Sequence, residues 1–208
     1  KSWAFAGGVL ILLLTGSLLY MESRPSPPPK VSGYVPVTHD GHRKALVGTD
    51  GSRIFFNEYP ASVSLIAQVS SSGGEVAHVS VPSPTMSLLA VSPDGANLLV
   101  ADEAGQTAFH GPLWEVPVLG GSPRRLGQAA GQNAAWSPDG QRIVYADGHD
   151  LFLAKSDGSE PAKLVTAPDQ AYYPEWSPDG TKIRFNLGAV GAVSPTGRLY
   201  QVLIDGTN

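Results

Sequence analysis

A four-residue phrase, Ser-Pro-Asp-Gly, constrains the fold of this chain more than any other feature of its sequence. The copies are Ser92–Gly95, Ser137–Gly140 and Ser177–Gly180, and Asp50-Gly51 is a weaker fourth copy. Proline presets the backbone of a turn, and serine, aspartate and glycine favour the remaining turn positions, so each copy predicts a chain reversal. The aspartates at 50, 94, 139 and 179 are separated by 44, 45 and 40 residues. A period of about 40–45 residues predicts a structural repeat.

The residues around these turns have the character of β-strands. Short apolar runs follow the three full copies, at Asn97–Val100, Arg142–Tyr145 and Lys182–Phe185. A second glycine-containing turn lies midway through each unit, at Gly73-Gly74, Gly120-Gly121, Asp157-Gly158 and Asp205-Gly206, and apolar or alternating runs such as Leu113–Val116, Leu151–Ala154 and Leu199–Val202 precede it. Two turns per unit, each flanked by strands, predict about four strands per unit, which is the blade of a β-propeller.

The fold class is therefore all-β: a partial β-propeller of about three and a half to four blades, each of four antiparallel strands. The segment Tyr34–Val47 resembles the later half-unit Leu151–Val165, with Asp40 in the place of Asp157. It predicts a half-blade of the kind that closes a ring onto its last blade. We expect the propeller to occupy residues 34–208 and to be truncated at its C-terminal end.

The N-terminal part of the sequence predicts a membrane anchor. Residues 1–20 contain an uncharged apolar run, Trp3–Tyr20, with aromatic residues at both ends, which is long enough to cross a bilayer as a single transmembrane helix. The alternative is a signal peptide with Lys1 as its basic end. Residues 21–33 hold Pro25 and Pro27–Pro29 and predict an extended linker between membrane and propeller.

Composition excludes some kinds of chemistry. The chain has no cysteine, which excludes disulfides and thiolate sites, and a net charge of −4 with both signs dispersed, which is not the footprint of a nucleic-acid-binding surface. The five histidines are His39, His42, His78, His110 and His149. His39 and His42 are neighbours, but no further ligand stands at metal spacing in the sequence.

The repeated turn aspartates are expected to bond the turn backbone, because a single active site would not need the same carboxylate in every unit. No nucleophile elbow, phosphate loop or dinucleotide fingerprint occurs. We therefore expect no catalytic, cofactor-binding or metal site in these residues, and no enzyme activity.

The phrase Trp-Ser-Pro-Asp-Gly with a following Ile and an aromatic residue, found at Trp136–Tyr145 and Trp176–Phe185, resembles the repeats of TolB-like propellers, which are WD-repeat-like. The resemblance spans residues 34–208, although Val91 replaces the tryptophan in one copy and Ser-Pro is lost before Asp50. The layout of helix, linker and repeats is similar to that of CadC-like regulators. In those proteins a cytoplasmic winged-helix DNA-binding domain precedes the helix and a sensory domain follows it outside.

That resemblance implies a non-catalytic sensor or protein-interaction propeller in a membrane-anchored bacterial regulator, with the propeller in the periplasm. A protein or small-molecule ligand is expected at the propeller mouth, and no nucleic acid on these residues. Two alternatives stay open. One is an envelope scaffold like TolB itself, and the other is the gating propeller of a prolyl-oligopeptidase-like peptidase.

Overall fold

A computed structural model describes residues 20, 33–60, 63–103, 110–188 and 198–207 of the chain. By its internal contacts the chain divides into two units, Lys1–Val35 and Pro36–Asn208. The predicted transmembrane helix and linker, residues 1–33, lie outside the described residues except for Tyr20 and Gly33. Within the described part of the chain, no helix is both long and apolar enough to span a bilayer.

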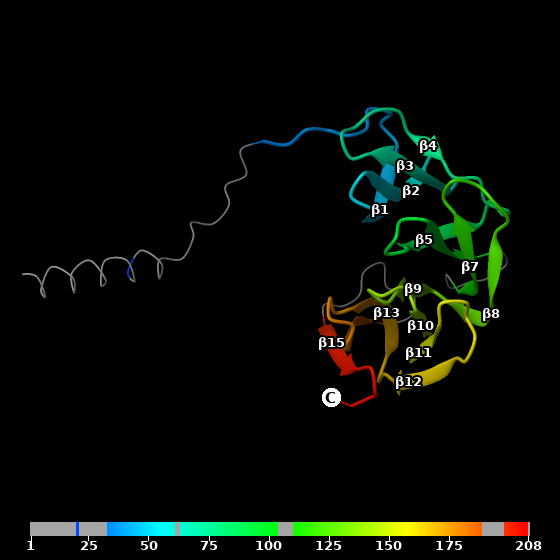
Figure 1. The fold of residues 1–208 in the computed structure, drawn as a ribbon, viewed down its shortest axis with the longest axis vertical. Helices are drawn as coiled ribbons and strands as arrows, with labels where there is room; N and C mark the ends of the chain where they lie inside the picture. Colours follow the sequence, from blue (N-terminus) through cyan, green and yellow to red (C-terminus); the bar gives the residue numbers. More distant parts are fainter. Residues whose placement is uncertain (1–19, 21–32, 61–62, 104–109, 189–197, 208) are drawn as a thin grey trace, which may run out of the picture. The chain divides into compact units, whose positions relative to one another are not determined.

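The second unit is all-β and consists of four antiparallel sheets, which we call blades 1 to 4 (Figure 1). Blade 1 contains β1 (Arg43–Thr49), β2 (Arg53–Tyr59), β3 (Leu65–Ser70) and β4 (Ala77–His78). Blade 2 contains β5 (Met86–Val91), β6 (Asn97–Asp102), β7 (Gly111–Pro117) and β8 (Arg124–Gly131). Blade 3 contains β9 (Asn133–Trp136), β10 (Arg142–Asp147), β11 (Asp150–Lys155) and β12 (Ala162–Thr166). Blade 4 contains β13 (Gln170–Trp176), β14 (Lys182–Gly188) and β15 (Arg198–Leu203).

Within every blade, neighbouring strands in the sequence are neighbours in the sheet. The first strands of successive blades contact one another, β1 with β5, β5 with β9 and β9 with β13. This sequential order of meandering sheets is a four-blade propeller arrangement. It confirms the predicted repeat, and the described strands fill three blades of four strands and one of three.

The predicted half-blade at Tyr34–Val47 is wrong. Residues 33–42 form no strand, and Arg43–Thr49 is the first strand of blade 1, paired with Arg53–Tyr59 across the Asp50 turn. Asp40 and Asp157 do share their local chemistry, because each carboxylate accepts a hydrogen bond from the backbone N–H two residues later. That bond specifies a turn but not the place of the turn in a sheet, so the similarity pointed to the wrong strand.

The hydrophobic core lies between the blades. Three apolar clusters fill the three interfaces, and each draws residues from two successive sheets. Their central members are Phe55, Ile66, Met86 and Leu98 between blades 1 and 2; Leu99, Leu113, Leu126 and Ile143 between blades 2 and 3; and Val144, Leu151, Ile183 and Phe185 between blades 3 and 4. Alternation along the second strand of a blade sends successive side chains to opposite faces. Leu98 and Leu99 therefore belong to different interfaces.

Candidate functional site

The turn aspartates are structural, as expected. Asp139 Oδ1 accepts hydrogen bonds from Ser137 Oγ at 2.5 Å and from the Gln141 backbone N–H at 3.0 Å. The serine hydroxyl in turn accepts from the Arg142 N–H at 2.9 Å, which closes the hairpin between the first two strands of the blade. The turns at Asp94 and Asp179 repeat these bonds. These carboxylates are therefore occupied by their own turns.

A different set of acids stands eight residues after the turn aspartates, at the end of the second strand. Glu58, Asp102 and Asp147 occupy this place in blades 1, 2 and 3. Thr85 Oγ1 donates to Asp102 at 2.6 Å, and His110 Nε2 lies 3.0 Å from Asp147 Oδ1. Sequence reasoning missed this set, although its constant offset from the turn was a usable signal.

The end of each second strand lies beside the start of the first strand, because the two are antiparallel neighbours. At this end of blade 1, Arg43 pairs with Tyr59, and the guanidinium carbon lies 4.8 Å from the centre of the tyrosine ring, a cation–π contact. At the same end of blade 2, Ser87 near the start of β5 hydrogen-bonds to Glu103, which follows β6. We call this end of the blades the mouth.

Charged and phenolic groups of three blades influence the ionisation of Tyr59 at the mouth. Burial raises the pKa of the Tyr59 hydroxyl; Arg43 opposes this rise, whereas Glu103 of blade 2 and Tyr173 of blade 4 add to it. Burial also raises the pKa of the Glu103 carboxyl, with Asp102 adding to the rise and Ser87 opposing it. Perturbed titratable groups that converge from separate elements are typical of functional sites.

Tyr173 is held in a strained position. Its backbone φ is 50°, a left-handed value that residues other than glycine and asparagine rarely adopt. Tyr173 is also 56% exposed. The register of β13 against β14 shifts between Tyr172 and Glu175, and the Tyr173 N–H donates to Asn133 Oδ1 of blade 3 at 3.2 Å. An exposed aromatic residue with a strained backbone is a candidate for direct ligand contact.

A buried amide network holds the strand that carries Tyr173. Gln132 Nε2 donates to the Ala171 carbonyl at 2.6 Å, and Gln170 Nε2 donates to Gln132 Oε1 at 2.9 Å. The Tyr172 hydroxyl completes the network by donating to Gln170 Oε1 at 2.8 Å. Both glutamines are buried, so the network ties blade 4 to blade 3 directly behind the mouth.

The mouth therefore offers a guanidinium, a carboxyl group, two phenol rings and a serine hydroxyl. This set can bind a polar or charged ligand by hydrogen bonds, by charge and by ring stacking. Among the mouth residues that the structure describes, no serine is paired with a histidine, the usual arrangement for nucleophilic catalysis.

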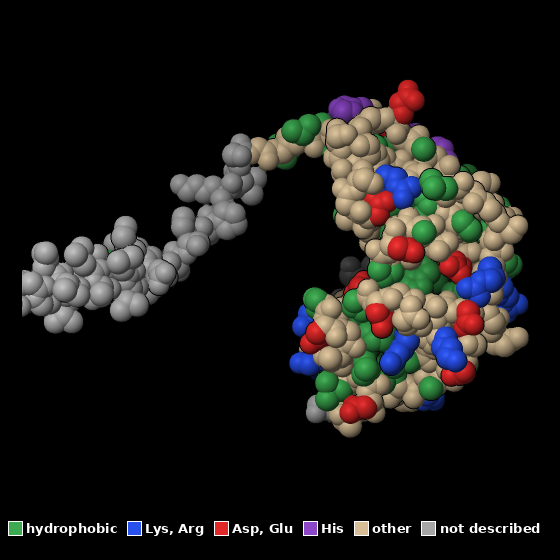
Figure 2. All heavy atoms as spheres, in the orientation of Figure 1, with side chains coloured by type: hydrophobic (Ala, Val, Ile, Leu, Met, Phe, Trp, Pro, Cys, Tyr) green, Lys and Arg blue, Asp and Glu red, His purple; other side chains and the backbone are tan. Residues whose placement is uncertain are grey.

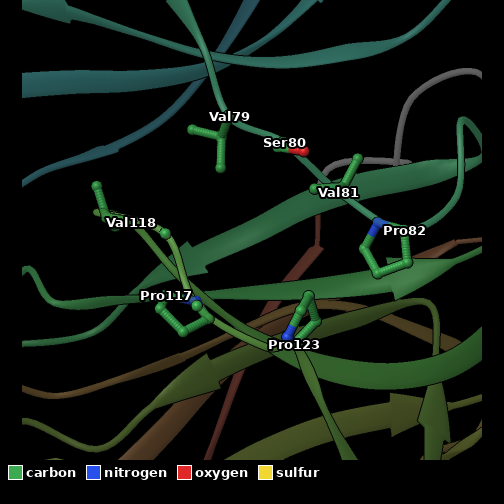
Figure 3. Close-up of a pocket in the computed structure, with 9 residues that line it drawn as sticks. Val79, Ser80, Val81, Pro82, Pro117, Val118 and Pro123 are labelled. Atoms are coloured by element: carbon green, nitrogen blue, oxygen red, sulfur yellow. The ribbon is translucent and has the colours of Figure 1, made fainter.

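A separate pocket lies between blades 1 and 2. Its volume is about 360 Å³, and it is formed by Val79–Pro82, which leads from blade 1 into blade 2, and by the turn between β7 and β8 (Figure 3). Val81, Val118, Pro117 and Pro123 line it. Leu119, in the same turn, is 91% exposed. Ser80, Gly120 and Gly121 also line it, so both polar and apolar groups border this pocket.

No family model matches the sequence. One curated protein, the uncharacterized peptidase YuxL of Bacillus subtilis (strain 168), is 30% identical over 76 residues, a match that covers 34% of this chain and 12% of that protein. The chain therefore matches only a small part of that relative.

Solved structures share the fold. A TolB from Agrobacterium tumefaciens is similar with a TM-score of 0.66 and 21% identity over 78% of this chain and 61% of its own. TolB from Acinetobacter baumannii is similar with a TM-score of 0.62 and 18% identity over 81% of this chain and 42% of its own. A gluconolactonase from Xanthomonas campestris, an enzyme, is also similar, with a TM-score of 0.56 and 13% identity over 73% of this chain and 57% of its own.

The chain spans less than two thirds of the length of each of these proteins. Its fold is thus a TolB-like β-propeller, and a shared fold does not by itself imply a shared function.

Proposed function

We propose that residues 34–208 form a non-catalytic sensor or protein-interaction propeller that binds its ligand at the mouth. The contact of Arg43 with Tyr59, together with the electrostatic influence of Glu103 and Tyr173 on Tyr59, supports this proposal. The partner would be a protein segment or small molecule that presents an anionic or hydrogen-bonding group to Arg43. The phenol rings would add apolar contact area at low entropic cost.

The mouth can be tested by comparing Arg43→Ala with Arg125→Ala in affinity capture from the bacterial envelope. Arg43 belongs to the mouth, whereas Arg125 is an exposed arginine of β8 on blade 2. We expect Arg43→Ala, and independently Tyr173→Ala, to lose the specific partner, and Arg125→Ala to retain it. Retention of the partner by both mouth variants would exclude the mouth as the binding site.

We further propose that the propeller belongs to a membrane-anchored bacterial regulator, with residues 1–20 as a single-pass anchor, residues 21–33 as the linker, the propeller in the periplasm and a winged-helix domain upstream. The apolar run and the proline-rich segment of the sequence support this layout. A topology reporter fused after Gly33 is expected to be active outside the cytoplasm. A cytoplasmic signal would contradict the regulator proposal and leave the mouth proposal intact.

One observation favours a second function. The match to YuxL, described as a peptidase, raises the proposal that this propeller gates a prolyl-oligopeptidase-like hydrolase domain. Sequencing the flanking reading frame distinguishes the two proposals. A downstream hydrolase domain would favour the peptidase, and an upstream winged-helix domain would favour the regulator. If neither is present and capture recovers envelope proteins alone, the TolB-like envelope scaffold is the function.

A further inference from the structure

Blade 1 contains a cluster of metal-ligating side chains next to the mouth residues Arg43 and Tyr59. Glu58 is the acid at the end of β2, and its side chain is 2% exposed. His42 Nδ1 lies 3.3 Å from Glu58 Oε1, and His78 Nε2, from β4, lies 2.7 Å from Glu58 Oε2. Asp40 lies beside them, and one ligand atom each from Asp40, His42 and Glu58 fall within 4.8 Å of one another. In Figure 2 histidine side chains are visible over the sheet of blade 1.

The cluster carries more negative charge than its own cation neutralises. The Lys44 ammonium group pairs with Glu58 Oε1 at 2.9 Å and also with Asp40 Oδ1. Two carboxylates thus share a single lysine, and one of these carboxylates is buried. His78 Nε2 contacts the other carboxylate oxygen of Glu58 at 2.7 Å. A buried carboxylate is stable only when it is well paired.

One measured distance in this cluster fits a divalent transition metal. Imidazole nitrogen and carboxylate oxygen bind Zn²⁺ at about 2.0–2.2 Å in tetrahedral geometry, so two ligand atoms lie about 3.3–3.5 Å apart. The observed 3.3 Å between His42 Nδ1 and Glu58 Oε1 matches that edge. His78 holds the other oxygen of Glu58, as outer hydrogen bonds do for metal-bound carboxylates. The position of the Lys44 ammonium between the two carboxylates marks where positive charge is favoured.

We propose that Asp40, His42 and Glu58 bind one Zn²⁺-like divalent cation on blade 1, with His78 orienting Glu58. Lys44 competes with the metal and must swing away when it binds. The side chain of His42 is 46% exposed and can rearrange at the surface, whereas that of Lys44 is 16% exposed and must leave a largely buried position. Sequence spacing alone does not connect Glu58 and His78 with His42, because β2 and β4 bring them to His42 only in the folded blade.

The experiment is titration of the full 208-residue chain, in detergent, with ZnCl₂ by isothermal calorimetry, and with CoCl₂ by the visible absorption of tetrahedral Co²⁺. We expect a 1:1 stoichiometry. His42→Ala and Asp40→Asn should each weaken binding at least about tenfold, and His78→Ala should weaken it by about 10–100-fold. Lys44→Met should strengthen it by about tenfold or more, because a competing positive charge is gone.

His39→Ala is the matched control, since His39 is an exposed histidine three residues from His42, and it should bind like the parent chain. Urea midpoints establish that each variant is folded; the half-exposed positions of His42 and His78 make these variants tolerable. The proposal is overturned if the parent chain shows no saturable 1:1 binding, including the case in which Lys44→Met alone binds. It is equally overturned if His42→Ala binds as tightly as His39→Ala.

Discussion

Replacing Gly158 by alanine should separate blades 2 and 3. Gly158 lies in the turn between β11 and β12 of blade 3, and an added Cβ would stand 2.3 Å from the carbonyl oxygen and 2.4 Å from the carbonyl carbon of Leu126, in β8 of blade 2. Contacts this short with backbone atoms cannot be relieved by a rotamer change. The two blades must move apart.

The magnitude has two parts. Gly158 has a φ of +79°, and a left-handed conformation costs an alanine about 1–2 kcal/mol. Forcing extra volume into a packed interface costs typically about 1–3 kcal/mol. We therefore expect a loss of about 2–5 kcal/mol in the free energy of unfolding.

Gly148→Ala isolates the first part. Gly148 has a φ of +61°, in the turn between β10 and β11 of the same blade, and an added Cβ would meet nothing within 4 Å. Its loss should be about 1–2 kcal/mol. Urea denaturation followed by tryptophan fluorescence measures both variants. If Gly158→Ala and Gly148→Ala lose the same free energy of unfolding, the inference that blades 2 and 3 approach closely at Leu126 is wrong.

Two further predictions concern the turns and the amide network. Hydrogen bonds from Ser177 and Thr181 lower the pKa of Asp179 from 3.8 to about 2, so its stabilising contribution should be complete above about pH 4 and disappear as the pH falls toward 2. Asp179→Asn should therefore reduce the pH dependence of the urea midpoint between pH 4 and pH 2. An unchanged pH dependence would contradict the role of Asp179 in the turn. Gln132→Ala should lower the free energy of unfolding by about 1–3 kcal/mol, because it leaves buried partners unsatisfied. Its control, Gln141→Ala in an exposed turn, should change the free energy of unfolding by less than about 0.5 kcal/mol. Equal losses in the two variants would refute a stabilising role for the amide network.

The repeat could be predicted from the sequence because its turns are stabilised by hydrogen bonds between residues that are close in the sequence. Pro93, Pro138 and Pro178 start turns whose serine and aspartate bonds close within five residues, so the turns, the flanking strands and the period follow from neighbouring residues alone. The first strand of blade 1 was missed for the same reason. Its Asp40 turn is locally equivalent to that of Asp157, and only the pairing with β2 distinguishes them.

The mouth and the blade 1 cluster depend on contacts between residues distant in the sequence. Tyr59 and Tyr173 belong to blades 1 and 4 and occupy no common position of the repeat, so no spacing connects them. The position of Glu58 could have been noticed in the sequence, because Glu58, Asp102 and Asp147 each lie eight residues after a turn aspartate. Its histidine neighbours, however, come from the segment before β1 and from β4, and that arrangement requires the folded sheet.

The placement of the apolar clusters between sheets determines how the propeller opens. Each of the three clusters between blades takes side chains from two successive blades, so blade 2 or blade 3, when released from both neighbours, exposes two apolar faces at once. In an array stabilised by nearest-neighbour contacts, cooperative opening follows the interfaces. Amide hydrogen exchange should accordingly show β6 and β10, which face each other across one cluster, exchanging as a single group.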